Sequence, residues 1–368
     1  MLNYPKTIGT KLKINYFCIV NIHEKYIKRC IELAQNGFGT TYPNPMVGSV
    51  IVYNNQIIGE GWHKKAGEPH AEVNAVRSVK DKSLLSKATI YVSLEPCSHF
   101  GKTPPCCDLI IEHKIPHVVV GTVDPNEKVA GNGIKKLIAA GANVTVGVLE
   151  KECYELNKRF FTFHQKKRPY ILLKWAESQD GFLSPEKQKD AERKPIWITN
   201  SYSRQLVHKW RSEEQAILAG TQTIIDDNPK LNTRDWSGNN PVRVILDQNN
   251  RISKDSFVFD DSAKTIVFTK SETSLSTENT TFTVIDFDHS IVPQITAALY
   301  QNQIQSVIIE GGTQTLQSFI DQNIWDEARI FIGRTSFKNG TKAPLIPKEN
   351  VTKTNILDDE LLNIRNHD

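Results

Sequence analysis

The chain has no apolar run that approaches the ~20 residues needed to cross a bilayer, so no membrane partner is expected. Cysteine is scarce, with six in 368 residues. Only Cys97, Cys106 and Cys107 lie close together, so a disulfide framework is not expected and a reducing, cytoplasmic location is favoured. Charge of one sign is also scarce, since the formal net charge is +4. This small excess argues against a nucleic-acid partner. It also argues against an enzyme that deaminates adenosine in RNA, because such an enzyme would need a basic face.

The second half also lacks the Gly-x-Gly-x-x-Gly fingerprint, so a Rossmann domain is not supported. Hydrophobic residues make up 39% and charged residues 23% of the chain, which is ordinary for a globular protein. A length of 368 residues suits two domains better than a single core.

The first half alternates short apolar strands with helices. Its first helix is expected over 23–36, because Gly37 and Gly39 would stop it. Strands are expected at 48–53, 57–60, 89–93, 117–123 and 144–148, and further helices at 70–79, 105–113 and 134–140. This order predicts a three-layer α/β domain over residues 22–150, after an extension over residues 1–21.

A charged, helical segment at 151–167 is interpreted as a linker, and a second α/β pattern follows at 168–368. Strands are expected there at 170–175, 242–246, 265–268, 281–285, 306–310 and 328–332, and helices at 201–212, 292–300 and 313–321. The fold class predicted for the whole chain is therefore α/β in both halves.

One histidine and two cysteines in the first half could hold a zinc ion. His70 and Cys106 lie near predicted helix starts, where the positive end of the helix favours a thiolate, and Cys97 ends a strand. Three protein ligands leave the fourth position open, as in catalytic zinc sites. Glu72 is placed to act as the general acid and base. These are the parts of a zinc-dependent deaminase, in which activated water displaces an amino group from a nucleobase-like ring.

Other interpretations of these residues stay open from the sequence. Cys107 could replace Cys106 as a ligand, although Cys106 is favoured because it directly follows Pro105. His99 is a further rival ligand. The cysteines could also be buried core residues, or the zinc could have a purely structural role.

Several motifs of the first half occur together in a fixed order. They are Asn44-Pro45-x-Val47-Gly48, Gly59-x-Gly61-Trp62-His63, His70-Ala71-Glu72, Glu95-Pro96-Cys97, Gly101-Lys102-Thr103-Pro104-Pro105-Cys106, Asp124-Pro125-Asn126 and Gly131-x-Gly133. This combination resembles the deaminase domain of the RibD family, the bifunctional deaminase–reductases of riboflavin biosynthesis.

The resemblance implies a cytidine-deaminase-like fold, with Zn²⁺ on His70, Cys97 and Cys106 and with Glu72 moving protons. It also implies contacts to the phosphorylated pyrimidine from Asn44, His63, Lys102 and Thr103. The chemistry agrees, since an asparagine amide can read a pyrimidine edge and a lysine suits a phosphate.

The second half carries a glycine turn, Glu310-Gly311-Gly312-Thr313, between a predicted strand and a predicted helix. Glycines there would let a phosphate approach the backbone N–H groups of the helix start, although a plain strand–helix turn is the alternative. The half opens with Arg168-Pro169-Tyr170-x-x-Leu173-Lys174-x-Ala176-x-Ser178-x-Asp180-Gly181. Its further motifs are Trp197-Ile198-Thr199, Ala219-Gly220-x-x-Thr223, Asp226-Asp227-Asn228-Pro229 and Leu231-x-x-Arg234. These motifs resemble the RibD reductase domain, whose fold is like dihydrofolate reductase.

For this half the resemblance implies two sets of contacts. The NADPH contacts are Ala176, Trp197, Thr223, Asp227, Gly312, Thr313, Gln314, Thr315, Leu316, Gln317 and Ser318. The substrate contacts are Lys174, Arg211, Leu231, Arg234 and Glu310. Two arginines facing one phosphate make chemical sense, because guanidinium forks match phosphate oxygens.

The resemblance thus implies an enzyme with two successive activities on one small molecule. The first domain would remove the 2-amino group of a phosphorylated diaminopyrimidine by hydrolysis. The second would use NADPH to reduce the ribosyl group to a ribityl chain, giving 5-amino-6-(5-phosphoribitylamino)uracil. The alternative is a second half that binds nucleotide without catalysis. As partners we expect the small-molecule substrate and further copies of the chain in a homo-oligomer.

Overall fold

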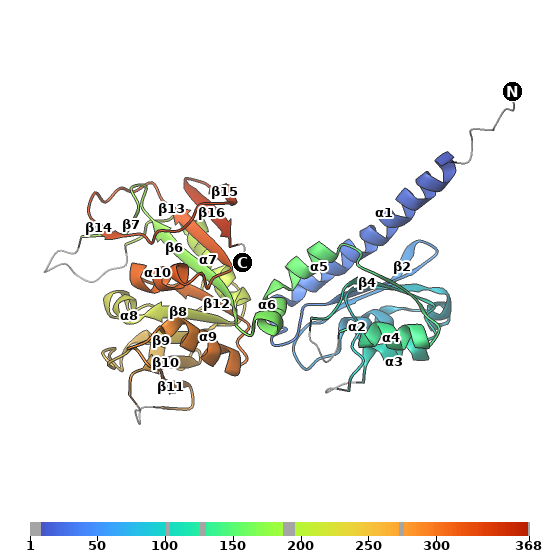
Figure 1. The fold of residues 1–368 in the computed structure, drawn as a ribbon, viewed down its shortest axis with the longest axis horizontal. Coiled ribbons are helices and arrows are strands. Elements are labelled where there is room, and N and C mark those ends of the chain that lie inside the picture. The colour runs from blue at the N-terminus through green and yellow to red at the C-terminus, as the bar shows by residue number, and fades with distance from the viewer. Residues whose placement is uncertain (1–8, 101–103, 126–129, 187–195, 272–275, 367–368) are drawn as a thin grey trace. The chain divides into compact units, whose positions relative to one another are not determined.

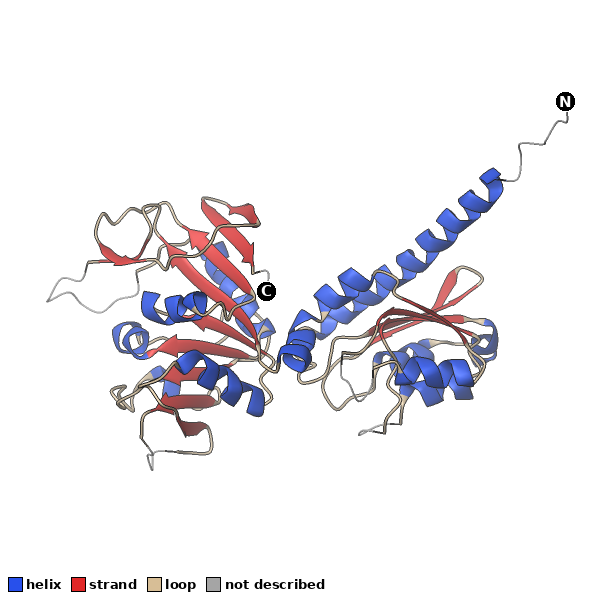
Figure 2. Ribbon diagram, in the orientation of Figure 1, coloured by secondary structure: helices blue, strands red, loops and turns tan. Residues whose placement is uncertain are grey.

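The computed structural model describes residues 9–100, 104–125, 130–186, 196–271 and 276–366, with the backbone alone for 9–21 (Figure 1). The chain divides into two compact units, Met1–Gln165 and Lys166–Asp368. Both units combine helices with a β-sheet, as Figure 2 shows. No helix in the described part of the chain is long and apolar enough to span a bilayer.

The first unit is built on a five-stranded sheet with the order β2-β1-β3-β4-β5. The strands are β1 (Gly48–Tyr53), β2 (Gln56–Trp62), β3 (Thr89–Leu94), β4 (His117–Thr122) and β5 (Asn143–Val146). β1 pairs antiparallel with β2 and β3, whereas β3, β4 and β5 run parallel. The carboxyl ends of β3 and β4 therefore lie at the same edge of the sheet.

Helices cover both faces of this sheet. The helices are α1 (Gly9–Ala34), α2 (Ala71–Ser78), α3 (Cys106–Glu112), α4 (Asn132–Ala139) and α5 (Glu150–Leu156). Val118 and Val120 of β4 face the helices α2, α3 and α4, whereas Val119 faces α1 and α5. Successive side chains of a strand point to opposite faces, so alternate valines build two core layers. The three-layer α/β prediction is confirmed.

The helix predicted over 23–36 begins earlier and ends sooner than expected. α1 runs from Gly9 to Ala34, and a 3-10 turn follows at Gln35–Gly37. The sequence has neither glycine nor proline between Gly9 and Gly37, so nothing in that run breaks a helix.

The segment interpreted as a linker is mostly helical. It contains most of α5 and all of α6 (Lys158–Lys166). Cys153 of α5 packs with the buried residues of α1, and Phe160 and Phe161 of α6 pack with Leu94 at the end of β3. These contacts attach both helices to the first unit.

The described part of the second unit has a nine-stranded sheet with the order β11-β10-β9-β8-β12-β6-β13-β16-β15. The strands are β6 (Tyr170–Glu177), β8 (Ala216–Gly220), β9 (Val242–Leu246), β10 (Thr265–Thr269), β11 (Thr280–Val284), β12 (Ser306–Glu310), β13 (Glu327–Ile332), β15 (Val351–Ile356) and β16 (Asp359–Arg365). All neighbours are parallel except the pairs β13–β16 and β16–β15.

The helices of this unit again lie on both faces of the sheet. They are α7 (Ser201–Glu213), α8 (Thr221–Asp227), α9 (Ile291–Gln301) and α10 (Thr313–Asp321). α7 and α8 pack on the face that carries Leu172 of β6, and α9 and α10 on the face that carries Leu173. A separate pair of short strands, β7 (Phe182–Pro185) and β14 (Gly340–Lys342), completes the described fold. The residue patterns of the sequence did not predict β7, β8, α8, β14, β15 or β16.

Candidate functional sites

Three side chains from three elements converge at the carboxyl end of β3. His70 immediately precedes α2, Cys97 follows β3, and Cys106 opens α3. His70 Nδ1 lies 3.5 Å from Cys97 Sγ and 3.3 Å from Cys106 Sγ, and the three ligand atoms all lie within 4.8 Å of one another. Tetrahedral zinc bonds of about 2.0 Å to nitrogen and about 2.3 Å to sulfur place such atoms about 3.5 Å apart. The donor set and its geometry therefore fit a zinc ion.

The rival ligands lie elsewhere. Cys107 Sγ donates hydrogen bonds to the carbonyl oxygens of Pro96 at 3.3 Å and Gly133 at 3.5 Å. Burial raises the pKa of the Cys107 thiol to about 12. His99 is exposed. Within the described ranges, His70, Cys97 and Cys106 are the group whose ligand atoms are close enough to share a metal ion.

The two cysteines of this group share one negative charge at neutral pH. Hydrogen bonds from the Cys106 thiol and from His70 lower the pKa of Cys97. Donation of that same hydrogen bond, together with burial, raises the pKa of Cys106. The backbone N–H of Cys106, 3.3 Å from Cys97 Sγ, adds to the stabilisation of the thiolate. Binding of a metal by both sulfurs would therefore release a proton.

Glu72 lies in the first turn of α2 and is 3% exposed. Burial raises its pKa to about 7. A carboxyl group with such a pKa can both accept and donate a proton near neutral pH, which is what a general acid and base requires.

Asn44 and His63 lie beside this group. Asn44 Nδ2 is 3.1 Å from His63 Nε2, and His63 Nδ1 is 3.2 Å from the carbonyl oxygen of Pro69. These two contacts assign the proton of His63 to Nδ1, so that Nε2 accepts from Asn44. The His63 ring meets the His70 ring edge-on at a centroid distance of 5.4 Å. The structure thus brings two of the four predicted pyrimidine contacts, Asn44 and His63, to the metal group. The other two, Lys102 and Thr103, lie outside the described residues.

Close backbone packing explains Gly61 of the motif Gly59-x-Gly61-Trp62-His63. A Cβ on Gly61 of β2 would lie 2.4 Å from the backbone nitrogen of Ala75 in α2. Asn74 of the same helix donates from Nδ2 to the carbonyl oxygen of Trp62 at 2.9 Å. The missing side chain lets α2 lie directly on β2, which sets the position of His70 at the start of that helix.

Glu95 belongs to one of the motifs, but the residue patterns assigned it no role. Its buried carboxylate accepts backbone N–H groups of Gly131 and Gly133, each at 2.9 Å, and those of Asp124 and Ile134, each at 3.3 Å. A Cβ on Gly133 would lie 2.1 Å from the carbonyl oxygen of Pro96. Glu95 therefore ties the start of α4 to the strand end that carries Cys97. An acidic residue two positions before a ligand cysteine was the available signal.

The second unit contains a cavity of about 940 Å³ beside the carboxyl ends of β6, β8 and β12. Ten of the predicted contact residues line it: Lys174, Ala176, Trp197, Arg211, Thr223, Asp227, Leu231, Arg234, Glu310 and Gly312. His208 also lines it and was not predicted. Its position three residues before Arg211 on one helix was the available signal, because residues at that spacing share a helix face.

Charged groups meet in the wall of this cavity. Arg211 Nη2 lies 2.8 Å from Glu310 Oε2, and Lys174 Nζ lies 3.7 Å from Glu310 Oε1. Burial alone would raise the pKa of Glu310, but Arg211 and Lys174 outweigh it and lower that pKa to about 2. Burial also lowers the pKa of Lys174. With Lys174 charged, the trio carries a net positive charge and suits an anionic ligand.

The glycine turn opens onto the same cavity at the start of α10. Thr223 Oγ1 accepts the backbone N–H of Gly312 at 3.1 Å, and Thr313 donates from Oγ1 to the carbonyl oxygen of Lys342. Of the helix residues predicted to contact a cofactor, Leu316 is fully buried in the core. Gln317 bonds with Asp321 and Leu345, Ser318 donates to the carbonyl oxygen of Thr315, and Gln314 is exposed. None of the residues Thr313 to Ser318 lines the cavity.

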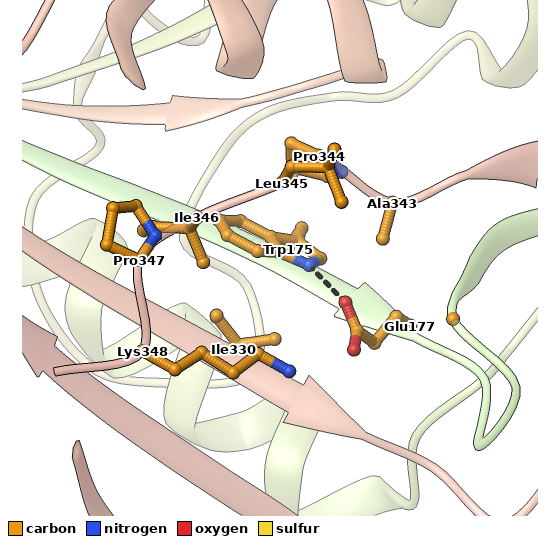
Figure 3. Close-up of a pocket in the computed structure, with 10 residues that line it drawn as sticks. Trp175, Glu177, Ile330, Ala343, Pro344, Leu345, Ile346, Pro347 and Lys348 are labelled. Carbon is orange, nitrogen blue, oxygen red and sulfur yellow. Dashed lines mark hydrogen bonds between the residues drawn. The ribbon is translucent and has the colours of Figure 1, made fainter. Parts of the chain in front are cut away.

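A smaller cavity of about 480 Å³ lies among Trp175, Ile330 and the segment 343–348 (Figure 3). Trp175 lines both cavities, and its Nε1 donates to Oε2 of Glu177, which lines the smaller one, at 2.7 Å. None of the predicted contact residues lines this cavity.

Comparison with known families divides the chain at the same place. Residues 20–122 match the cytidine and deoxycytidylate deaminase zinc-binding region, and residues 169–366 match the RibD C-terminal domain. The chain thus combines a zinc-binding deaminase-type domain with a RibD-type second domain, which confirms both predicted fold classes. It belongs to the family of the riboflavin biosynthesis protein RibD.

Curated relatives and solved structures agree with this membership. The RibD proteins of Aquifex aeolicus and Escherichia coli are 41% and 35% identical, over 85% and 84% of this chain and 87% of each relative. A solved diaminohydroxyphosphoribosylaminopyrimidine deaminase/5-amino-6-(5-phosphoribosylamino)uracil reductase from Thermotoga maritima is 39% identical, with a TM-score of 0.84. Acinetobacter baumannii RibD is 30% identical, with a TM-score of 0.83. Each of these two structures covers 94% of this chain, which in turn covers 99% of each of them.

Proposed function

We propose that the chain is a bifunctional enzyme of riboflavin biosynthesis. Its two activities are those of a diaminohydroxyphosphoribosylaminopyrimidine deaminase and a 5-amino-6-(5-phosphoribosylamino)uracil reductase. The observation that carries the proposal is the convergence of His70, Cys97 and Cys106 beside buried Glu72, in a chain whose second unit has a separate, positively charged cavity. The proposed limits of the two functional domains are 22–150 and 168–368.

In the deaminase domain, His70, Cys97 and Cys106 would hold zinc, which supplies the Lewis acidity that makes water a nucleophile near neutral pH. Glu72 would take a proton from the attacking water and deliver it to the departing amino group, which would leave as ammonia. Asn44 and His63 hold and orient the pyrimidine, and the hydrogen bond between them fixes both side chains. The proposed roles of Lys102 and Thr103 concern the ribose phosphate.

In the reductase domain, we propose NADPH as the source of the hydride that reduces the ribosyl group. A cavity of about 940 Å³ has room for a large ligand. Ala176, Trp197, Thr223 and Asp227 would contact the cofactor, and the N–H groups at the start of α10 suit its phosphates. Lys174, Arg211, Leu231, Arg234 and Glu310 would contact the substrate. Of the remaining predicted contacts, Thr313, Gln314 and Thr315 would reach the cofactor phosphates through their backbone N–H groups, because the helical hydrogen bonds of α10 begin with Leu316 N–H to Gly312. Leu316, Gln317 and Ser318 would support this turn without touching the cofactor.

The proposed partners are small molecules and further copies of the chain in a homo-oligomer. The proposed location is the cytoplasm, because a reducing compartment keeps Cys97 and Cys106 available as zinc ligands.

The test uses the purified full chain and two substrates. With the diaminopyrimidine phosphoribosyl compound we expect ammonia release, and with the deaminated product we expect oxidation of NADPH. Ammonia release without NADPH oxidation would leave the second unit as a non-catalytic nucleotide-binding module. Absence of ammonia release from a chain with full zinc content would remove the deaminase assignment.

A further inference from the structure

We infer that His208 is a positioning residue of the reductase site, which holds the backbone of Arg234 so that its guanidinium faces the anionic end of the substrate. The inference rests on the proposed reductase function and adds to it a residue of the cavity wall that acts on the substrate through Arg234.

His208 joins α7 to the segment that follows α8. It is 3% exposed and shares one face of α7 with Arg211. His208 Nδ1 lies 3.4 Å from the backbone nitrogen of Arg234, and its Nε2 lies 3.2 Å from Asp235 Oδ2. Arg211 Nη1 donates to the carbonyl oxygen of Asn232 at 3.3 Å. His208 and Arg211, both on α7, thus contact Asn232, Arg234 and Asp235.

The charge state of His208 decides the direction of its hydrogen bonds. Burial, together with the positive charges of Arg211 and Arg234, lowers its pKa to about 4. The imidazole is therefore neutral at physiological pH. Its Nδ1 accepts the N–H of Arg234, and its Nε2–H donates to the carboxylate of Asp235. Asp235 and the backbone of Asn232 oppose the lowering of the pKa but do not outweigh it.

The held segment has little other support from regular structure. Residues 228–234 form neither helix nor strand, and Asn228 and Leu231 have the positive φ angles +39° and +48°. The side chain of Arg234 is 43% exposed, and its contacts with Asn232 Oδ1 at 3.5 Å and Asp235 Oδ2 at 3.9 Å are long. The direction of this arginine therefore depends on where its backbone is held. Asn240 Oδ1 accepts the N–H of the preceding Thr233 at 2.9 Å, and the Thr233 hydroxyl donates to the carbonyl oxygen of Asn239 at 3.1 Å. His208 holds the N–H of Arg234 itself.

Loss of this anchor would weaken capture of the substrate and leave the hydride step intact. We expect His208→Gln to raise the reductase KM for the pyrimidine substrate about tenfold. The variant keeps a donor for Asp235 but loses the acceptor at the Nδ1 position. A change of about tenfold lies within the usual range of interaction energies between residues in contact. The kcat and the KM for NADPH should change less than about twofold. His208→Asn places its Oδ1 near the Nδ1 position and should restore most of the substrate affinity.

The decisive experiment is a double-mutant cycle of His208→Gln with Arg234→Ala, measured as NADPH oxidation by the full chain. If His208 acts through Arg234, the double variant has the same KM as Arg234→Ala alone. Lys209→Gln, a change beside His208 on the same helix that alters a surface ion pair, serves as the matched control.

Additive effects in the cycle, or an unchanged KM in His208→Gln, would overturn the inference while the reductase assignment stands. A lower kcat without a change in KM would also overturn it, because it would place His208 in the chemical step or in general stability. No NADPH oxidation by the wild type would overturn the reductase assignment and the inference together.

Discussion

Arg211 and Glu310 form a bidentate ion pair in the wall of the larger cavity, with Arg211 Nη2 2.8 Å from Glu310 Oε2 and Nε 3.4 Å from Oε1. Their side chains are only 11% and 13% exposed, and Lys174 lies 3.7 Å from the same carboxylate. Glu310 thus balances the positive charges of Arg211 and Lys174, the two side chains that would also contact the substrate.

Glu310→Gln removes that counter-charge and leaves Arg211 and Lys174 to repel each other. We expect the second unit to lose about 2 kcal/mol of unfolding free energy in urea, since removal of one partner of a nearly buried pair is costly. NADPH oxidation should be lost and ammonia release kept. Asp288→Asn breaks the exposed pair with Lys270 and should cost less than about 0.5 kcal/mol. An equal loss in both variants would contradict this account of Glu310.

Cys106→Ser and Cys107→Ser form a matched pair at adjacent positions. Cys106 Sγ faces His70, whereas Cys107 Sγ donates to backbone carbonyl oxygens. A serine hydroxyl is a poor replacement for a thiolate ligand. Metal analysis should therefore find almost no zinc in Cys106→Ser and full zinc in Cys107→Ser. The opposite result would make Cys107 the ligand.

Glu95→Gln replaces one accepting oxygen by an NH₂ group that faces backbone N–H donors. We expect the first unit to lose about 2 kcal/mol of unfolding free energy, because buried donors lose their acceptor. Ammonia release should fall while NADPH oxidation stays. Glu155→Gln, on the half-exposed ion pair with Lys158, is the control and should leave both activities unchanged. Equal stability of the two variants would contradict the role given to Glu95.

His208 predicts a pH dependence of stability. Its pKa in the fold is about 4, against an ordinary value of 6.5, so the unfolded chain takes up the proton first as pH falls. The corresponding stabilisation is complete above pH 6.5 and is lost as pH falls toward 4. We expect the wild type to lose about 2 kcal/mol more than His208→Gln between pH 7 and pH 4.5. Parallel urea unfolding profiles for the two proteins would contradict this.

Residue patterns predicted the strands and helices that carry clear periodicity or strong end signals. β12 and α10 match their predicted ranges, 306–310 and 313–321, because an apolar run, two glycines and an amphipathic helix follow one another. β8 and α8 were missed, since α8 begins at the residue that follows Ala216–Gly220, with no loop to mark the change. The hairpin of β15 and β16 turns at Leu357, whose positive φ of +55° has no glycine or asparagine to signal it.

The residues of the candidate sites also differ in whether the sequence reveals them. His70, Glu72, Cys97 and Cys106 could be found from the sequence because metal chemistry restricts both residue type and order. Glu95 and His208 act on backbone groups that are distant in the sequence, Gly131 at 2.9 Å and Arg234 at 3.4 Å. Backbone partners leave no residue type to recognise, so only the folded chain reveals such contacts.

The central claim is that one zinc ion, held by His70, Cys97 and Cys106, works with Glu72 to release ammonia. Zinc content and ammonia release measured on the same preparation of Glu72→Gln test it most directly. We expect full zinc content, a fall in ammonia release of at least about 10²-fold, and normal NADPH oxidation with the deaminated product. Full zinc content with undiminished ammonia release would contradict the account, because the metal would then be structural and Glu72 would carry no proton.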